Sequence, residues 1–132
     1  MTIKLDESKE KIYGLDRLDL NKPVNIVEGP IDSLFLDNCI AMAGADVSLK
    51  IPTDQCTMIF DNEPRNEQIV NRMIDAVHKN YKVVIFPESL KYKDINDMVI
   101  HKKELGDVSK LIYNNRQNGL AALQSINKWK RI

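Results

Sequence analysis

Four short apolar runs, set apart by helical or turn-forming stretches, constrain the fold of this chain more than any other feature. They occupy residues 23–28, 39–43, 56–60 and 82–86. Each has the length of a strand and is followed by Gly, Asp or Pro, which is typical of strands buried inside a sheet. Helical patterns lie between and after them. This alternation predicts an α/β fold with a mainly parallel, four-stranded sheet flanked by helices.

The helices are predicted from apolar spacing and from residues that favour helix starts. Pro30 at a first helical position and Asp32 in the first turn favour a helix over residues 31–37. Residues 45–55 are expected to form a loop. The predicted helices are residues 31–37, 66–79, 94–101, 108–113 and 119–129.

The length of 132 residues predicts one domain. Residues 1–22 are polar, and we expect them to form a lead-in that could add a strand or turn to the domain edge. Residues 23–132 are expected to form the domain itself. The charged stretch Met1–Glu10 is unlike a secretory signal, and no apolar run is long enough to cross a bilayer. No membrane association is therefore expected.

Charge and cysteine usage give weaker signals. Residues 1–63 carry six Lys/Arg against twelve Asp/Glu, while residues 64–132 carry thirteen against seven. This segregation of charge fits a site with metal on one side and phosphate on the other. The alternative is that charged residues on solvent-exposed faces are segregated by chance. Cys39 and Cys56 lie in apolar surroundings without a C-x-x-C pair, so we expect buried free thiols, as in a reducing cytoplasm.

Acidic residues follow three of the four predicted strands. Glu28 ends the first run, Asp61 follows the third with Glu63 two residues on, and Asp94 lies beyond the fourth. Asp32 follows Glu28 by about one helical turn. In open parallel sheets, ligands bind outside the carboxyl ends of the strands. The sequence therefore predicts that these acids converge in one pocket at that edge.

Such a pocket suits a hard divalent cation. Clustered carboxylates repel one another without a counter-ion, and Mg²⁺ prefers oxygen ligands. One ion or two could stabilise the attacking and leaving oxygens of phosphoryl transfer. Gly29 has no side chain to keep a phosphate or metal from the backbone. Each aspartate has a local alternative, since Asp32 could complement a helix dipole, Asp61 form a turn and Asp94 cap a helix.

Four segments resemble the motifs of the Toprim family. Residues 24–34 resemble its first motif, a hydrophobic strand followed by Glu-Gly and then by Asp in a helix. Residues 40–44 resemble the next strand, with a small residue and Gly. Residues 58–63 (Met-Ile-Phe-Asp-Asn-Glu) resemble the second motif, normally Asp-x-Asp, and residues 93–97 (Lys-Asp-Ile-Asn-Asp) resemble a late stretch of primase-type members.

The resemblance implies a compact, Rossmann-like Toprim fold and magnesium-dependent nucleotidyl transfer, with Mn²⁺ as a possible substitute. By their positions in the motifs, Glu28, Asp61 and Glu63 would be catalytic. With Asp32 and Asp94 they would also hold the metal. Glu63 departs from the family pattern, because glutamate is one methylene longer than the usual aspartate.

The late motif and the small size suggest a bacteriophage DNA primase or primase-helicase, acting in the cytoplasm of an infected bacterium. Its partners would be nucleotides, a single-stranded DNA template and a replicative helicase. Arg65 could contact phosphate or be an exposed residue at a helix start. The candidate nucleotide or nucleic-acid contacts are Gly29, Arg65, Lys91 and Lys93, and Lys102 and Lys103 extend the basic strip.

Two alternatives to primer synthesis remain open from sequence. A Toprim nuclease would use the same metals with water as the nucleophile, and a non-catalytic module would bind nucleic acid or a replisome partner. Trp129 lies among basic residues and could stack on single-stranded nucleic acid. The favoured interpretation is that it anchors the last helix on the core.

Overall fold

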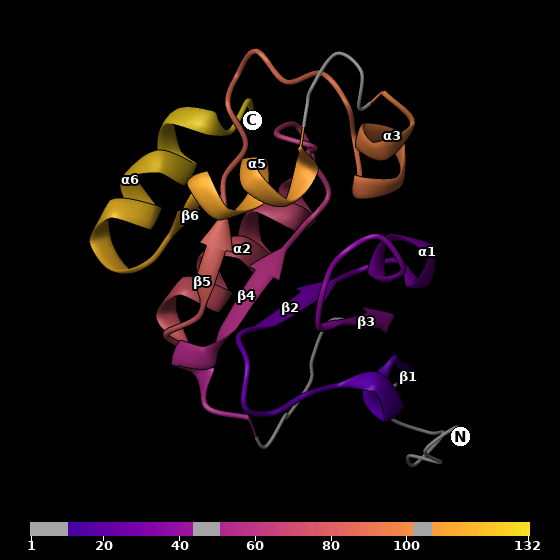
Figure 1. Cartoon of the computed structure of the whole chain (residues 1–132). Helices are drawn as coiled ribbons and strands as arrows, with labels where there is room; N and C mark the ends of the chain where they lie inside the picture. The colour runs from indigo at the N-terminus through magenta and orange to yellow at the C-terminus, as the bar shows by residue number, and fades with distance from the viewer. Residues whose placement is uncertain (1–10, 44–50, 102–106) are drawn as a thin grey trace.

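The computed structural model describes residues 11–43, 51–101 and 107–132, which form an α/β structure around one sheet (Figure 1). Within these residues, six strands pair in the order β1-β3-β2-β4-β5-β6. Their bounds are Lys11–Tyr13 for β1, Val24–Val27 for β2, Cys39–Ala43 for β3, Cys56–Ile59 for β4, Lys82–Val84 for β5 and Arg116–Gln117 for β6.

The four central strands are parallel, and the two outer strands are antiparallel to their neighbours. The α/β class and the four predicted strands are confirmed, but the prediction that the sheet has four strands is wrong. The additional strands β1 and β6 have three and two residues. Strands so short cannot show the alternation of apolar and polar residues by which a sequence marks a strand.

Apolar side chains alternate between the two faces of the sheet, as the pleat requires. In β2, Val24 and Ile26 belong to the core on one face, and Val27 belongs to the core on the other. Helices α2 (Glu67–His78) and α6 (Gly119–Trp129) cover the first face, whereas α3 (Ile95–Ile100) and α5 (Val108–Asn114) cover the second. The sheet is therefore the middle of three layers.

Four of the five predicted helices are confirmed to within one residue at each end. The predicted helix at 31–37 is wrong in length, because α1 is the single turn Pro30–Ser33. Ile31, Leu34 and Phe35 have helical spacing, but they are 60%, 64% and 41% exposed. A short helix needs packing along an apolar face to persist, and these side chains do not supply it.

Helix α2 has well-formed ends. The Asn66 side chain caps its first turn by accepting a hydrogen bond from the Ile69 N–H at 3.2 Å. At the other end, Asn80 adopts the left-handed conformation with φ +70°, and the Tyr81 N–H returns to the Ala76 carbonyl at 3.0 Å. These caps satisfy backbone groups that a helix end leaves unpaired, so both ends of α2 are fixed where the helix packs on the sheet.

Several predictions lie partly or wholly outside the described residues. The predicted lead-in contributes β1 to the sheet edge, but residues 1–10 are outside, and the division of the chain at residue 22 stays a prediction. The predicted loop at 45–55 is described only from residue 51, where it includes η2 (Thr53–Gln55). Lys102 and Lys103 are likewise outside.

The prediction of buried free thiols is confirmed, because Cys39 and Cys56 are both buried and unpaired. Burial raises the pKa of the Cys39 thiol to about 12 and that of Cys56 to about 11, so both are inert. Across the described part of the chain, none of the helices is long and apolar enough to cross a membrane.

Candidate metal centre

Three aspartates from three strand–helix connections meet at the carboxyl edge of the sheet. Asp32 lies in α1 after β2, Asp61 follows β4, and Asp94 precedes α3 in the connection from β5. Each offers one carboxylate oxygen, and these three oxygens lie within 4.8 Å of one another. Asp32 is buried and the other two are half-buried. We call these residues the acidic triad.

Helix α3 fixes two members of the triad. The Asp94 carboxylate caps α3 by accepting a hydrogen bond from the Asp97 N–H at 2.8 Å. Asp32 accepts from the Asn96 N–H at 2.8 Å, so it interacts with the start of α3 and not only with its own short helix. Capping and triad membership are therefore compatible roles for Asp94, because each uses only part of the carboxylate's capacity to accept.

The electrostatics of the triad are unfavourable without a cation. Burial and, after it, the charges of Glu28, Asp32 and Asp94 together raise the pKa of the Asp61 carboxyl to about 6, while the charge of Lys93 opposes them. Burial is also the main cause of the raised pKa of Asp32, which the hydrogen bond from Asn96 partly offsets. The chain thus maintains several carboxylates close together, which a divalent cation would relieve.

Glu28 lies beside the triad but is not one of the three carboxylates that approach one another. Its Oε2 forms an ion pair with Arg72 Nη1 of α2 at 3.1 Å. Its Oε1 is buried and has no hydrogen-bond partner. Because its charge still raises the pKa of Asp32 and Asp61, Glu28 belongs to the electrostatic surroundings of the triad. Its predicted role as a metal ligand stays a prediction.

Glu63 and Gly29 also lie next to the triad. Glu63 Oε1 is 3.9 Å from Lys93 Nζ, and its Oε2 accepts from the Asn66 side chain at 3.4 Å. It is not among the three converging carboxylates, so its role as a ligand stays a prediction. A Cβ at Gly29 would lie 3.2 Å from Asp32 Oδ2. The glycine therefore leaves room for the buried carboxylate.

Two of the basic candidates line a groove whose wall includes Asn62 and Glu63, the two residues that follow Asp61. Arg65 and Lys91 are exposed and line this groove of about 950 Å³, which begins at Glu63 and extends to Trp129 and Arg131. Lys93 lies closer to the acids, because its charge lowers the pKa of both Asp32 and Asp61. Contact between these cations and a nucleotide or nucleic acid stays a prediction.

Asn62 donates hydrogen bonds to three backbone carbonyls of the segment before Asp94, and the sequence did not predict these contacts. Its backbone N–H donates to the Lys93 carbonyl at 2.5 Å. Its side-chain Nδ2 donates to the carbonyls of Leu90 and Tyr92 at 3.1 and 3.0 Å. Three hydrogen bonds thus hold the segment before Asp94 against the residue after Asp61, and they set the approach of two members of the triad.

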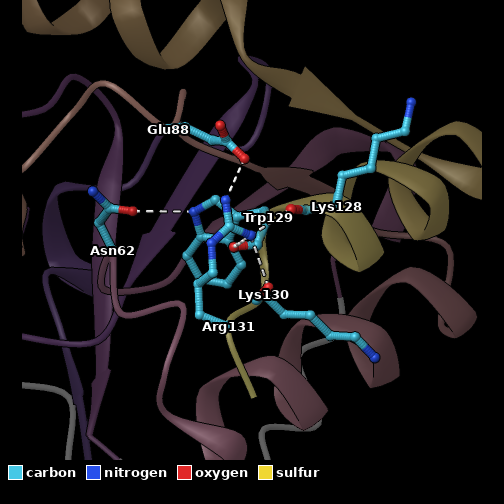
Figure 2. Close-up of polar contacts among 6 residues, drawn as sticks. All are labelled: Asn62, Glu88, Lys128, Trp129, Lys130 and Arg131. Carbon is cyan, nitrogen blue, oxygen red and sulfur yellow. Dashed lines mark hydrogen bonds and ion pairs between the residues drawn. The ribbon is translucent and has the colours of Figure 1, made fainter.

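The C-terminal residues complete this network (Figure 2). Trp129 is 5% exposed and donates from Nε1 to Asn62 Oδ1 at 3.2 Å. Arg131 donates from its backbone N–H to the Pro64 carbonyl at 2.7 Å, and its guanidinium pairs with Glu88. The favoured interpretation of Trp129 as a core anchor is confirmed. Nothing in the local sequence marks it as a partner of Asn62.

Comparison with known proteins supports one relationship. No protein-family model matches the chain. The chain is 33% identical to the DNA primase of Enterobacteria phage T4 over 136 aligned positions, which cover all of this chain and 40% of that primase. The chain thus spans well under half the length of the relative it matches. This similarity, together with a triad of aspartates that could bind a metal ion, supports a primase-related domain.

Proposed function

We propose that this chain is the catalytic Toprim domain of a phage-type DNA primase, which joins ribonucleotides into primers on single-stranded DNA with Mg²⁺ as cofactor. The acidic triad carries the proposal, because three carboxylate oxygens within 4.8 Å of one another come from three separate connections. The similarity to a phage primase supports the same class of activity.

The residues present fit a magnesium ion. All three triad members offer hard oxygen ligands, which Mg²⁺ prefers. Burial together with repulsion from neighbouring acids raises the pKa of Asp32 and of Asp61 and so disfavours their charged forms. Asp32, Asp61 and Asp94 would hold the ion. When bound, the metal would neutralise charge on the phosphates during phosphoryl transfer.

The protein's own groups would supply positioning and proton transfer. Glu28, whose Oε1 has no hydrogen-bond partner in the chain, would accept a hydrogen bond, and then the proton, from the 3′-hydroxyl of the growing primer. Lys93 and the exposed cations Arg65 and Lys91 would attract nucleotide phosphates to the groove beside the triad. A replicative helicase is the partner that a primase of this kind would have.

Metal titration tests the triad directly. Calorimetry with Mn²⁺ is expected to show binding to the unmodified protein and at least about tenfold weaker binding to Asp61→Asn, since one of three anionic ligands is lost. Asp75→Asn is the matched control, because it makes the same chemical change on the exposed surface of α2. Equal Mn²⁺ affinity in all three proteins would refute the metal site.

Activity assays test the reaction. Incubation with ribonucleotides, Mg²⁺ and a single-stranded DNA template is expected to yield short RNA, and Asp61→Asn is expected to yield none. The same preparations are incubated with labelled DNA and RNA. Metal-dependent cleavage without primer synthesis would instead identify a nuclease, and neither activity despite metal binding would favour a binding module.

A further inference from the structure

A second pocket lies between α5, β6 and the residues that precede β2. It has a volume of about 250 Å³, and Lys22, Pro23, Tyr113 and Arg116 are among the residues that line it. Lys22 and Pro23 stand before β2, whereas the acidic triad lies beyond the other end of that strand. The four residues of β2 span about 13 Å, and none of the triad lines the pocket. A ligand here would therefore be separate from the metal centre.

The wall of the pocket that precedes β2 and β3 is fixed by hydrogen bonds. The Asn38 side chain donates to the carbonyls of Asp19 and Pro23 at 2.9 and 2.8 Å and accepts from the Asp19 N–H at 2.7 Å. The Asn25 side chain donates to the Asp37 carbonyl at 2.9 Å. Because these bonds hold the backbone of both wall segments, the pocket is formed before a ligand arrives, and binding does not have to order it.

The part of the pocket formed by α5 and β6 combines an aromatic ring with a cation. Tyr113 is 66% exposed, and Arg116 Cζ lies 4.1 Å from the centroid of its ring. The ion pairs formed among the described residues do not include Arg116. Lys22 adds a second, exposed cation, and Asp37 is the acid on the wall. The pocket therefore favours a ligand that carries both a flat ring and a negative charge.

Size and chemistry favour a nucleobase as the ring. The pocket is smaller than the roughly 300–1,000 Å³ of pockets that hold drug-sized ligands, so it takes one ring-sized group. Nucleobases stack on aromatic rings and on guanidinium planes, and Lys22 would attract the phosphate that accompanies the base. An apolar side chain of a protein would instead remove Arg116 from water without supplying an anion, which is unfavourable.

We propose that this pocket binds one base of a single-stranded nucleic acid, which stacks against Tyr113 and Arg116 while Lys22 contacts the backbone phosphate. We call it the stacking pocket. The inference goes beyond the proposed function, because it requires neither a metal ion nor a reaction. In a primase, the stacking pocket would give the template a contact separate from the metal centre.

Fluorescence anisotropy of a fluorescein-labelled oligothymidylate of about 12 nucleotides tests the proposal. The titrations are made in EDTA at several salt concentrations. Tyr113→Leu keeps apolar bulk and removes the ring, so we expect about tenfold weaker binding with an unchanged salt dependence. Lys22→Gln removes a phosphate contact, so the slope of log affinity against log salt concentration is expected to fall in magnitude by about 0.7. Arg116→Gln removes a stacking plane and a charge, so it is expected to change both quantities.

Lys79→Gln is the matched control for the loss of a charge. Lys79 is exposed at the end of α2, which covers the other face of the sheet. Its replacement is expected to leave affinity within about twofold and the salt slope unchanged, because no phosphate contact is lost. Circular dichroism checks that each variant is folded, as is expected from the exposure of Lys22 and Tyr113.

Equal affinity of Tyr113→Leu and the unmodified protein would overturn the proposal. So would an absence of oligonucleotide binding by the unmodified protein at low salt, or a loss in Lys79→Gln as large as that in Tyr113→Leu. Failure of the proposed function is distinguishable from these results. Primer synthesis depends on the metal that EDTA removes, whereas binding in the stacking pocket does not.

Discussion

Two neighbouring residues, Asp61 and Asn62, are in opposite situations at the same edge of the sheet. Asp61 lies among carboxylates, and its pKa is raised to about 6 by burial and by three other acids. Asn62 lies in a network in which both its side-chain amide nitrogen and its oxygen have partners. The charged side chain of Asp61 is in an unfavourable environment, whereas both polar atoms of the Asn62 side chain have hydrogen-bond partners.

The difference shows how the fold maintains the triad. Carboxylates from separate connections would move apart if the connections were free to do so. The Asn62 network ties the segment before Asp94 to the end of β4, and the hydrogen bond from Asn96 restrains Asp32. Stability supplied by the network therefore offsets repulsion within the triad, as is common at functional sites.

The largest effect is expected from breaking the network at its centre. Asn62→Ala removes the donors to Leu90 and Tyr92 and the acceptor for Trp129, leaving part-buried groups unpaired. We expect a loss of about 4 kcal/mol in the free energy of unfolding. Urea denaturation measures it, and Mn²⁺ affinity is expected to fall as well, because the segment carrying Asp94 is released.

Asn115→Ala is the control for this change. The Asn115 side chain makes one hydrogen bond, to the Leu111 carbonyl within α5, so its loss is expected to cost about 1 kcal/mol and to leave Mn²⁺ affinity unchanged. If Asn62→Ala and Asn115→Ala prove equally stable, the network does not support the site.

The next largest effect is expected at Asp61, as a dependence of stability on pH. The ordinary pKa of the Asp61 carboxyl is 3.8 and its pKa in the folded protein is about 6, so between these values the folded protein binds more protons than the unfolded chain. Linkage makes stability fall as pH rises through this window. Above pH 6 the metal-free protein carries the full penalty, up to about 3 kcal/mol.

Asp61→Asn is expected to remove that penalty. In EDTA at pH 8, urea denaturation should show the variant to be more stable than the unmodified protein, with the difference vanishing near pH 3.5. Mg²⁺ should then stabilise only the unmodified protein. A metal-free variant that is less stable at pH 8 would show that Asp61 is not under electrostatic strain.

Much of this edge could be predicted from sequence, because its signals are local. Asp61 directly follows an apolar run, and a parallel sheet brings the ends of such runs together. Asp94 lies in the connection after the fourth apolar run, and Asp32 lies one helical turn after Glu28, which ends the first run, so both were expected at the same edge. The strands and the longer helices are likewise marked by apolar periodicity.

The rest could not be predicted, because it depends on side-chain direction and on distant contacts. Trp129 and Asn62 are 67 residues apart in the chain. Arg72 is one of several polar residues on α2, and only the packing of that helix brings it to Glu28. The sequence placed Glu28 with the other acids, but it could not indicate that Glu28 pairs with Arg72 and is not one of the three converging carboxylates.

A smaller effect is expected at the outer part of the network. Trp129→Phe keeps most of the buried ring but removes the donor to Asn62 Oδ1, so we expect a loss of about 1.5 kcal/mol. The double variant with Asn62→Ala should lose less than the sum of the two, because both changes remove the same hydrogen bond. Additive losses would show that the two residues act independently.

The smallest effect is expected from Glu88, although its pairing with Arg131 is prominent in the network (Figure 2). The two side chains are 69% and 45% exposed, and an ion pair in solvent contributes little. Arg131 also keeps its backbone hydrogen bond to Pro64. Glu88→Gln is therefore expected to change the free energy of unfolding by less than about 0.5 kcal/mol. Any difference should disappear in 1 M salt, because the Debye screening length is then about threefold shorter than at 0.1 M. A larger loss in urea denaturation would mean that the tail is held by charge, and not by the buried contact between Trp129 and Asn62.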